Sequence, residues 1–134
     1  MNNIASVAGR FGLSLIFILS GFAKLGAGYA GTQGYMEAMG VPGALLPLVI
    51  LAEIGGGLAI LFGLLTRTAA VSLAAFSLVS AFLFHFDLAD QGQFINFMKN
   101  IAIAGGMLML VASGAGKFSV DNWLVSRRNV GGAR

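Results

Sequence analysis

Cysteine is absent from this chain of 134 residues, and histidine occurs once. The absence of cysteine excludes disulfides, iron–sulfur clusters and CxxC redox chemistry, although it identifies no cellular compartment. One histidine without cysteine cannot supply a typical zinc ligand set or hold a haem between two histidines. We therefore expect no metal centre, and no residue pattern favours a haem held by methionine and histidine.

Charge is also scarce, since Asp, Glu, Lys and Arg together make up 10% of the residues. A soluble domain contains about a quarter. The net charge of +3 comes from basic residues that are scattered or lie near the C-terminus, so nucleic-acid binding is not expected. Apolar residues make up 57%, and the 20 glycines suit membrane helices whose backbones approach closely. The sequence therefore predicts that the lipid bilayer is its solvent and partner.

Four long apolar runs are what the sequence does contain. A bilayer core of about 30 Å requires about 20 helical residues, and each run is close to that length. Continuous runs favour helices over the alternating strands of a barrel, and runs that are apolar on every face exclude a soluble helical bundle. The predicted fold is all-α, an integral membrane four-helix bundle with short interfacial helices. Its spanning domain covers residues 1–118, with helices at about residues 4–27, 44–65, 68–86 and 94–113, followed by a cytoplasmic amphipathic tail at 119–134.

A secretory signal peptide is the alternative interpretation of the first run, with residues 11–19 as its apolar core. However, no Lys or Arg precedes Arg10, and Gly28-Tyr29-Ala30 is a poor cleavage site. We therefore interpret this segment as a retained helix.

Basic residues predict how the chain crosses the membrane. The turn between the second and third runs contains Arg67, whereas the two loops on the other side contain the acidic residues Glu37, Asp87 and Asp90. Short loops rich in Lys and Arg remain inside, so both termini are predicted to lie in the cytoplasm. The tail adds further basic residues on that side, namely Lys117, Arg127, Arg128 and Arg134.

Two segments outside the long runs are predicted to form short interfacial helices. The segment Thr32–Met39 begins with a residue suited to an N-cap and is followed by Gly40, which favours a helix end. The segment Ser119–Arg128 combines an apolar face that includes Trp123 with basic residues that suit anionic headgroups. The chain after Asn129 is expected to be disordered.

A glycine run lies in the middle of the second apolar stretch. Gly55, Gly56 and Gly57 are not followed by the Gly-Lys-Ser/Thr of a phosphate-binding loop. Together with Ala59 and Gly63 they form a ridge of small residues, which predicts close helix packing.

Polar residues inside the apolar runs are the candidates for function, because each ionisable group costs about 2.5–3.5 kcal/mol to insert. Arg10 and Lys24 are 14 residues apart, nearly four helical turns, so they share a face with Ser14 and Gly21. Arg10 lies toward the cytoplasm and is expected to have a structural role. All four runs also place polar groups in the outer half of the bundle, and these are the predicted ligand-binding residues Lys24, Glu53, His85, Asn96, Lys99 and Asn100.

Two interpretations of these polar residues stay open. In the structural one, Glu53 pairs with Lys99 or Arg10, and the asparagines bridge helices, because buried charges normally neutralise one another. In the functional one, the groups surround a small-molecule pocket. Donors outnumber the single carboxylate, which suits an anion, a carbonyl or a quinone oxygen, and His85 is the one side chain that normally titrates near neutral pH. The plausible walls of such a pocket are Phe17, Phe84, Phe94 and Phe97.

These residues resemble the DoxX family of four-helix membrane proteins. The combination is Arg and Gly-x-x-Lys in the first run, Glu before glycines in the second, and Met-Lys-Asn in the fourth. It occurs in the stretches GRFGLSLIFILSGFAKL, GTQGYMEAMGVPGALLPLVILAEIGGGLAILFGLLTR and FMKNIAIAGGMLML. The positions that match are Arg10, Gly21, Lys24, Glu53, Met98, Lys99 and Asn100.

The resemblance implies a bacterial inner-membrane location and a quinone-linked role, because some members of the family are associated with membrane oxidoreductases, including thiosulfate:quinone oxidoreductases, and with oxidative-stress complexes. The leading hypothesis is therefore a subunit that binds a quinone or another small organic ligand and works with a soluble or membrane redox partner. This chain carries no electron carrier of its own, so independent catalysis is not predicted. The alternatives are a small-solute transporter or exporter, which would require a homo-oligomer, and a membrane anchor for a soluble enzyme.

Overall fold

The computed structural model describes residues 3–132, and over that range it contains helices and no strand. Four helical segments are long and apolar enough to cross a membrane, which confirms the predicted all-α fold with four spans. The spans are α1 (Asn3–Ala23), α3 (Leu46–Phe62, extended at its start by the 3-10 turn η1, Gly43–Leu45), α4 (Thr66–Phe84) and α5 (Gln91–Ser113). The remaining helices are α2 (Ala27–Ala38) and α6 (Val120–Gly131).

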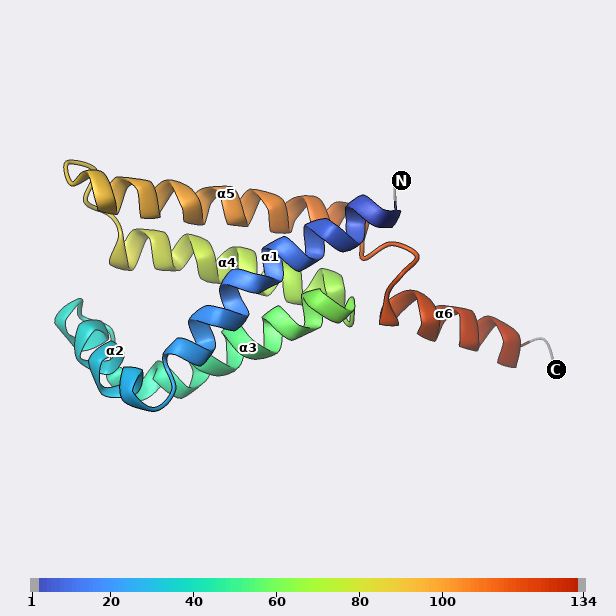
Figure 1. Cartoon of the computed structure of the whole chain (residues 1–134), viewed down its shortest axis with the longest axis horizontal. Helices are drawn as coiled ribbons and strands as arrows, with labels where there is room; N and C mark the ends of the chain where they lie inside the picture. The colour runs from blue at the N-terminus through green and yellow to red at the C-terminus, as the bar shows by residue number, and fades with distance from the viewer. Residues whose placement is uncertain (1–2, 133–134) are drawn as a thin grey trace.

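The spanning helices form two pairs. α1 packs along α3, and α4 packs along α5, while α3 and α4 make a smaller contact and α1 and α5 touch only slightly. Figure 1 shows that α1 starts beside α5 and moves away from it toward α2. We name the two ends of the bundle after the short helices that lie there, so the N-terminus of α1 is at the α6 end and the α4–α5 loop is at the α2 end (Figure 1).

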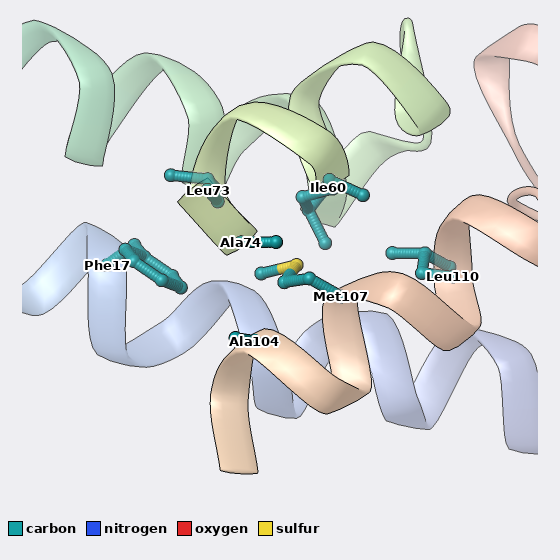
Figure 2. Packing of buried hydrophobic residues seen from close by; sticks show 8 residues of the cluster. Phe17, Ile60, Leu73, Ala74, Ala104, Met107 and Leu110 are labelled. Atoms are coloured by element: carbon teal, nitrogen blue, oxygen red, sulfur yellow. The ribbon is translucent and has the colours of Figure 1, made fainter. Parts of the chain in front are cut away.

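The main apolar core lies toward the α6 end and receives side chains from all four spans. Phe17 of α1, Ile60 of α3, Leu73 of α4 and Met107 of α5 belong to one buried cluster, and Figure 2 shows Met107 between the helices. Outside this cluster, large apolar side chains are exposed, such as Leu51 at 68%. In a membrane such side chains contact lipid, so the fold depends on close helix packing more than on exclusion of water.

Glycines allow the close approach of α3 to two neighbours. A Cβ atom on Gly56 would lie 2.9 Å from Leu73 of α4, and one on Gly57 would lie 2.7 Å from Ile18 of α1. The glycine run therefore serves helix packing, as the sequence predicted. The residues do not form one ridge, however, because Gly56 and Gly57 contact different helices and Gly55 meets only Leu51 of its own helix.

α1 ends and α2 begins earlier than the sequence predicted. α1 ends at Ala23 and not near residue 27, because Gly26 adopts a positive φ of 61° that starts a new helix. α2 therefore begins five residues before Thr32. That residue is not an N-cap, and its hydroxyl donates to the backbone oxygen of Gly28 at 2.8 Å.

Arg10 joins three segments at the α6 end. Its side chain is 3% exposed, and Nη1 donates to the backbone oxygens of Leu61 at 3.1 Å and Ile60 at 3.4 Å. Nη2 donates to the backbone oxygen of Phe118, just before α6. The last carbonyls of a helix have no partner within it, so Arg10 satisfies the end of α3 and holds the start of α6 against it.

Asp121, in the first turn of α6, holds α6 to the start of α4. Its carboxylate accepts from the backbone nitrogens of Leu65 at 2.7 Å and Thr66 at 2.9 Å, and so caps the first turn of α4. Burial by itself would raise the pKa of Asp121, but its hydrogen bonds with Thr66 and Leu65 and the charge of Arg10 hold that pKa below its usual value.

Beyond Asp121, α6 projects away from the bundle (Figure 1). It is helical through Gly131, so the predicted disorder after Asn129 is wrong up to that residue, and residues 133–134 lie outside the described part of the chain. Arg127 lies over the ring of Trp123, 4.5 Å from its centroid. This cation–π contact helps to order an otherwise exposed helix.

Candidate functional site

A cavity of about 360 Å³ lies between the helices toward the α2 end. Helices α1 to α5 all contribute to its lining, which places polar groups from different spans around one space. Every residue predicted to bind a ligand lines this cavity, namely Lys24, Glu53, His85, Asn96, Lys99 and Asn100. Arg10 does not line it and lies at the other end of the bundle.

Glu53 pairs with Lys24 across the α1–α3 contact. Lys24 Nζ lies 2.8 Å from Glu53 Oε1, and the two side chains are 20% and 3% exposed. The predicted pairing of Glu53 with Lys99 or Arg10 is therefore wrong. The reason is local, because Gly21 lies one turn before Lys24, and a Cβ atom there would be 3.3 Å from the Cβ of Glu53. α1 thus approaches α3 closely enough for its own lysine to reach the carboxylate.

Lys24 is fixed by a second partner on its own helix. Its Nζ lies 2.6 Å from the hydroxyl of Ser20, one turn earlier, and Ser20 also lines the cavity. The buried carboxylate is thus neutralised by a lysine that is itself hydrogen-bonded, as a charge inside a membrane protein requires. The pair contributes polarity to the cavity wall without a net charge.

α5 presents a polar stripe to the cavity. Asn96, Lys99 and Asn100 are spaced by three and four residues, so they lie on one side of the helix. The apolar residue Ile103 follows on the same side and also lines the cavity. The amide of Asn100 donates to the backbone oxygen of Asn96 at 3.2 Å, so this contact is within α5 and does not bridge helices as predicted. Among residues 3–132, the Lys99 ammonium has no ion-pair or hydrogen-bond partner.

His85 ends α4 at the rim of the cavity. Its Nδ1 lies 2.7 Å from the side-chain oxygen of Gln93, in the first turn of α5. With that oxygen as acceptor, Nδ1 donates, and Nε2 is the ring nitrogen left to accept a hydrogen bond. Gln93 thereby fixes the ring and ties the two ends of the α4–α5 loop together.

Aromatic side chains form much of the apolar wall. Phe17 and Phe84 line the cavity as the sequence predicted, but Phe94 and Phe97 do not, and Phe76 takes their place. Phe97 instead packs against two aromatic rings of the α4 end, with its centroid 5.2 Å from that of Phe82 and 5.7 Å from that of Phe86.

Tyr35 closes the cavity on the α2 side. Its hydroxyl donates to the backbone oxygen of Phe84 at 3.2 Å, and its ring lies 5.6 Å from the ring of that residue. Met36 of α2 is buried next to it, against Leu46 and Ile50 of α3. α2 therefore acts as a cover over this end, held by contacts to both α3 and α4.

Sequence reasoning missed three residues that shape the site: Ser20, Tyr35 and Phe76. Ser20 precedes Lys24 by four residues, so the helical spacing was a usable signal for that contact. Tyr35 and Phe76 gave no comparable signal, because their roles depend on how α2 and α4 pack against the rest.

The cavity combines hydrogen-bond donors with apolar walls. With Glu53 already neutralised, Lys99 and Asn100 remain as donors on one wall, and aromatic rings supply apolar walls opposite. Within residues 3–132, no cluster of three or more His, Asp or Glu side chains is placed to hold a metal ion.

Comparison with known proteins agrees with this architecture. Residues 5–86 match the sequence model of the DoxX family. The chain is 52% identical over 124 residues to inner membrane protein YqjF of Escherichia coli (strain K12), covering 92% of this chain and 95% of that protein. It is 35% identical over 119 residues to inner membrane protein YphA of the same organism, covering 84% of each. No solved structure matches the chain. This chain therefore belongs to the DoxX family and is a multi-pass inner membrane protein.

Proposed function

We propose that this protein is a subunit of a quinone-linked or oxidative-stress oxidoreductase system, and that it binds a quinone or a similar small organic ligand in the cavity at the α2 end. The observation that carries the proposal is the convergence of six polar residues from four helices on one cavity of about 360 Å³. That volume is at the low end of the range for small-molecule sites, which is about 300–1,000 Å³.

The chemistry of the walls favours a carbonyl-bearing ring over a fully charged solute. A quinone ring needs apolar surfaces for its faces and donors for its two oxygens. The apolar surfaces are provided by Phe17, Phe76 and Phe84, and the donors are Lys99 and Asn100. Because Lys24 neutralises Glu53, the Lys99 ammonium is left to donate to a quinone oxygen.

A redox partner is part of the proposal. The chain has no cysteine and one histidine, so it offers no thiol centre and no typical ligand set for a haem or a zinc ion. Electrons that reach a bound quinone must therefore come from another protein, and the role of this subunit is to hold and orient the ligand.

Ligand binding is testable by thermal unfolding of the purified protein in detergent. A soluble benzoquinone should raise Tm, because a ligand that binds only the folded state stabilises it. Lys99→Met should reduce this rise, and it should fold normally because Lys99 has no partner in residues 3–132 to lose. The matched control is Arg127→Met on α6, which removes the same charge far from the cavity.

Other outcomes would favour other functions. A rise in Tm with small anions but not with quinones would favour a solute transporter. No rise with either, combined with co-purification of a soluble enzyme in equal amounts, would favour a membrane anchor. An equal effect of Lys99→Met and Arg127→Met on the quinone response would contradict the proposed site.

We also propose that the α6 end faces the cytoplasm and that the cavity lies in the outer half of the membrane. Arg67 lies in the first turn of α4, Lys117 just before α6 and Arg128 in α6, while Asp87 and Asp90 lie in the α4–α5 loop. That loop is at the opposite end of the bundle from α6 (Figure 1), so the basic residues favour the α6 end as the inner one. A C-terminal fluorescent fusion should therefore be bright, and a C-terminal phosphatase fusion should be inactive. An active phosphatase fusion would reverse the orientation.

A further inference from the structure

The cavity has a side that the neighbouring helices do not close. α1 and α5 both line it, yet they touch only slightly. Their contact lies toward the α6 end, where a Cβ atom on Gly106 would lie 3.0 Å from the side chain of Leu13. From there α1 moves away from α5 (Figure 1). The residues that line the cavity follow Leu13 on α1, starting at Ile16, and precede Gly106 on α5, ending at Ile103.

The residues on this side form what we call the lateral opening: Ile16 and Ser20 of α1, and Lys99 and Ile103 of α5. All four line the cavity, and two of them are also exposed on the outside of the bundle, Ile16 at 46% and Lys99. A residue that both lines a cavity and is exposed marks its edge. Tyr35 of α2, at 45%, and Asn96 of α5 also line the cavity and are exposed, so the cavity has a second edge at the α2 end, which the hydrogen bond from the Tyr35 hydroxyl to the backbone oxygen of Phe84 bridges.

The lateral opening lies within the spanning part of the protein. Lys99 is eight residues from the start of α5 at Gln91, which corresponds to about 12 Å along the helix. Beside it on α5, Ile95 and Met98 are exposed and apolar, as expected for a surface in contact with acyl chains, while Asn96 is an exposed polar neighbour one turn earlier. An unpaired ammonium at this depth is costly, unless an oxygen-bearing group lies against it.

From this geometry we infer that the cavity takes its ligand sideways from the membrane, and that the ligand is an amphiphile whose ring occupies the cavity while its apolar tail leaves between α1 and α5. This inference rests on the proposed function and specifies its ligand as a tailed quinone. A cavity of about 360 Å³ has room for a ring and its substituents, so a long tail must lie outside it. Lys99, at the edge, is then placed at the junction of the polar ring and the tail.

Closing the lateral opening tests the inference directly. The chain has no cysteine, so Ile16→Cys with Ile103→Cys introduces a unique pair that a short bifunctional thiol reagent can bridge by disulfides. The matched control pair is Leu13→Cys with Gly106→Cys, on the same two helices where they already touch. Two probes are compared by their effect on Tm: a benzoquinone with a ten-carbon alkyl tail, and the same benzoquinone without the tail.

Bridging the opening should abolish the Tm rise given by the tailed quinone and leave that of the tailless quinone. After the bridge has been reduced, the reductant removed and the free thiols capped with a small thiol reagent, the response should return, and bridging the control pair should change neither response. Full stabilisation of the bridged protein by the tailed quinone would overturn the inference. Equal loss of both responses would also overturn it, since the bridge would then block the cavity and not the tail.

A second measurement keeps the lateral opening testable even if no quinone binds, so that the proposed function and this inference can fail separately. In a Trp123→Phe background, Phe76→Trp places the one tryptophan on the cavity wall, and the protein is reconstituted with phospholipids brominated on their acyl chains. Acyl chains that reach the cavity should quench this fluorescence, and the bridge should remove that quenching. Leu108→Trp, on the exposed surface of α5, should be quenched with or without the bridge. Quenching at position 76 that the bridge leaves unchanged would overturn the inference.

Discussion

Arg10 and Lys24 lie on the same side of α1, but they belong to two very different ends of the bundle. At the α6 end, Arg10 is surrounded by backbone oxygens of α3 and of the segment before α6, and an apolar core lies next to it. At the α2 end, Lys24 meets one carboxylate, and the space beyond it is a cavity. A basic residue thus completes a tightly packed region at the α6 end, and another basic residue borders a cavity at the α2 end.

The difference shows how a buried charge can be interpreted once its partners are known. The Arg10 guanidinium donates to backbone carbonyls from both terminal nitrogens and lies away from the cavity, so its role is structural, although its buried Nε has no partner among the described residues. A lysine such as Lys99, which has no partner in the described part of the chain and lines a cavity, retains all of its donors. The comparison therefore associates stabilisation of the fold with the α6 end and the proposed ligand site with the α2 end, and three predictions test it.

The largest effect is expected for Arg10→Met. This change leaves the backbone oxygens of Leu61 and Phe118 without their donor and should lower the free energy of unfolding by on the order of 3 kcal/mol. Thermal unfolding in detergent measures the loss. Arg127→Met, on the exposed part of α6, serves as control. If both variants unfold at the same temperature, Arg10 does not hold the α6 end together.

A smaller effect is expected for the ion pair at the α2 end. Glu53→Gln should cost on the order of 2 kcal/mol, less than a fully buried pair, because Lys24 is 20% exposed. The double variant Glu53→Gln with Lys24→Met should recover much of the loss. Glu53→Gln with Lys99→Met should instead give additive changes in the free energy of unfolding. Coupling between Glu53 and Lys99, without coupling between Glu53 and Lys24, would show that the partner has been assigned wrongly.

The smallest effect is expected for Asp121 and depends on pH. Because its pKa is lowered in the folded protein, its contribution is fully present above the usual value of 3.8 and is lost as the pH falls through the folded-state pKa. The contribution of this cap is about 1 kcal/mol. Acid should therefore release the start of α6, which the fluorescence of the neighbouring Trp123 reports.

Asp121→Asn is the control for that titration. An amide cannot ionise, so the variant should show the released fluorescence at neutral pH and no further change as the pH falls below about 4. A titration that is identical in the variant and the original protein would assign the acid response to another group.

Much of the fold could be predicted from sequence, because apolar run length is a direct physical requirement of the bilayer. The polar residues of the site could be found for the same reason, since Glu53 and Lys99 are costly in lipid wherever their helices pack. Their convergence on one cavity follows from each lying toward the same end of its helix.

The pairing of these residues could not be predicted, because it depends on which helices touch. Spacing alone placed Glu53 within reach of several basic groups, and the choice of Lys24 follows from the close α1–α3 packing at Gly21. The wall residue Phe76 was missed for a related reason, since periodicity does not specify the rotation of α4 about its axis. The early start of α2 depended on one backbone angle at Gly26, which sequence alone leaves undetermined.

The division of the spans into an α1–α3 pair and an α4–α5 pair has a consequence for biosynthesis. The first pair is complete once the ribosome has passed Gly63, so α1 and α3 can associate in the membrane while the second pair is still being made. The cavity does not exist at that stage, because half of its lining belongs to α4 and α5. Arg10 must wait longer still, since Phe118 follows α5 in the chain. A nascent chain thus acquires the cavity, and then the contact that joins α1 to the segment before α6, only after α5 has been made.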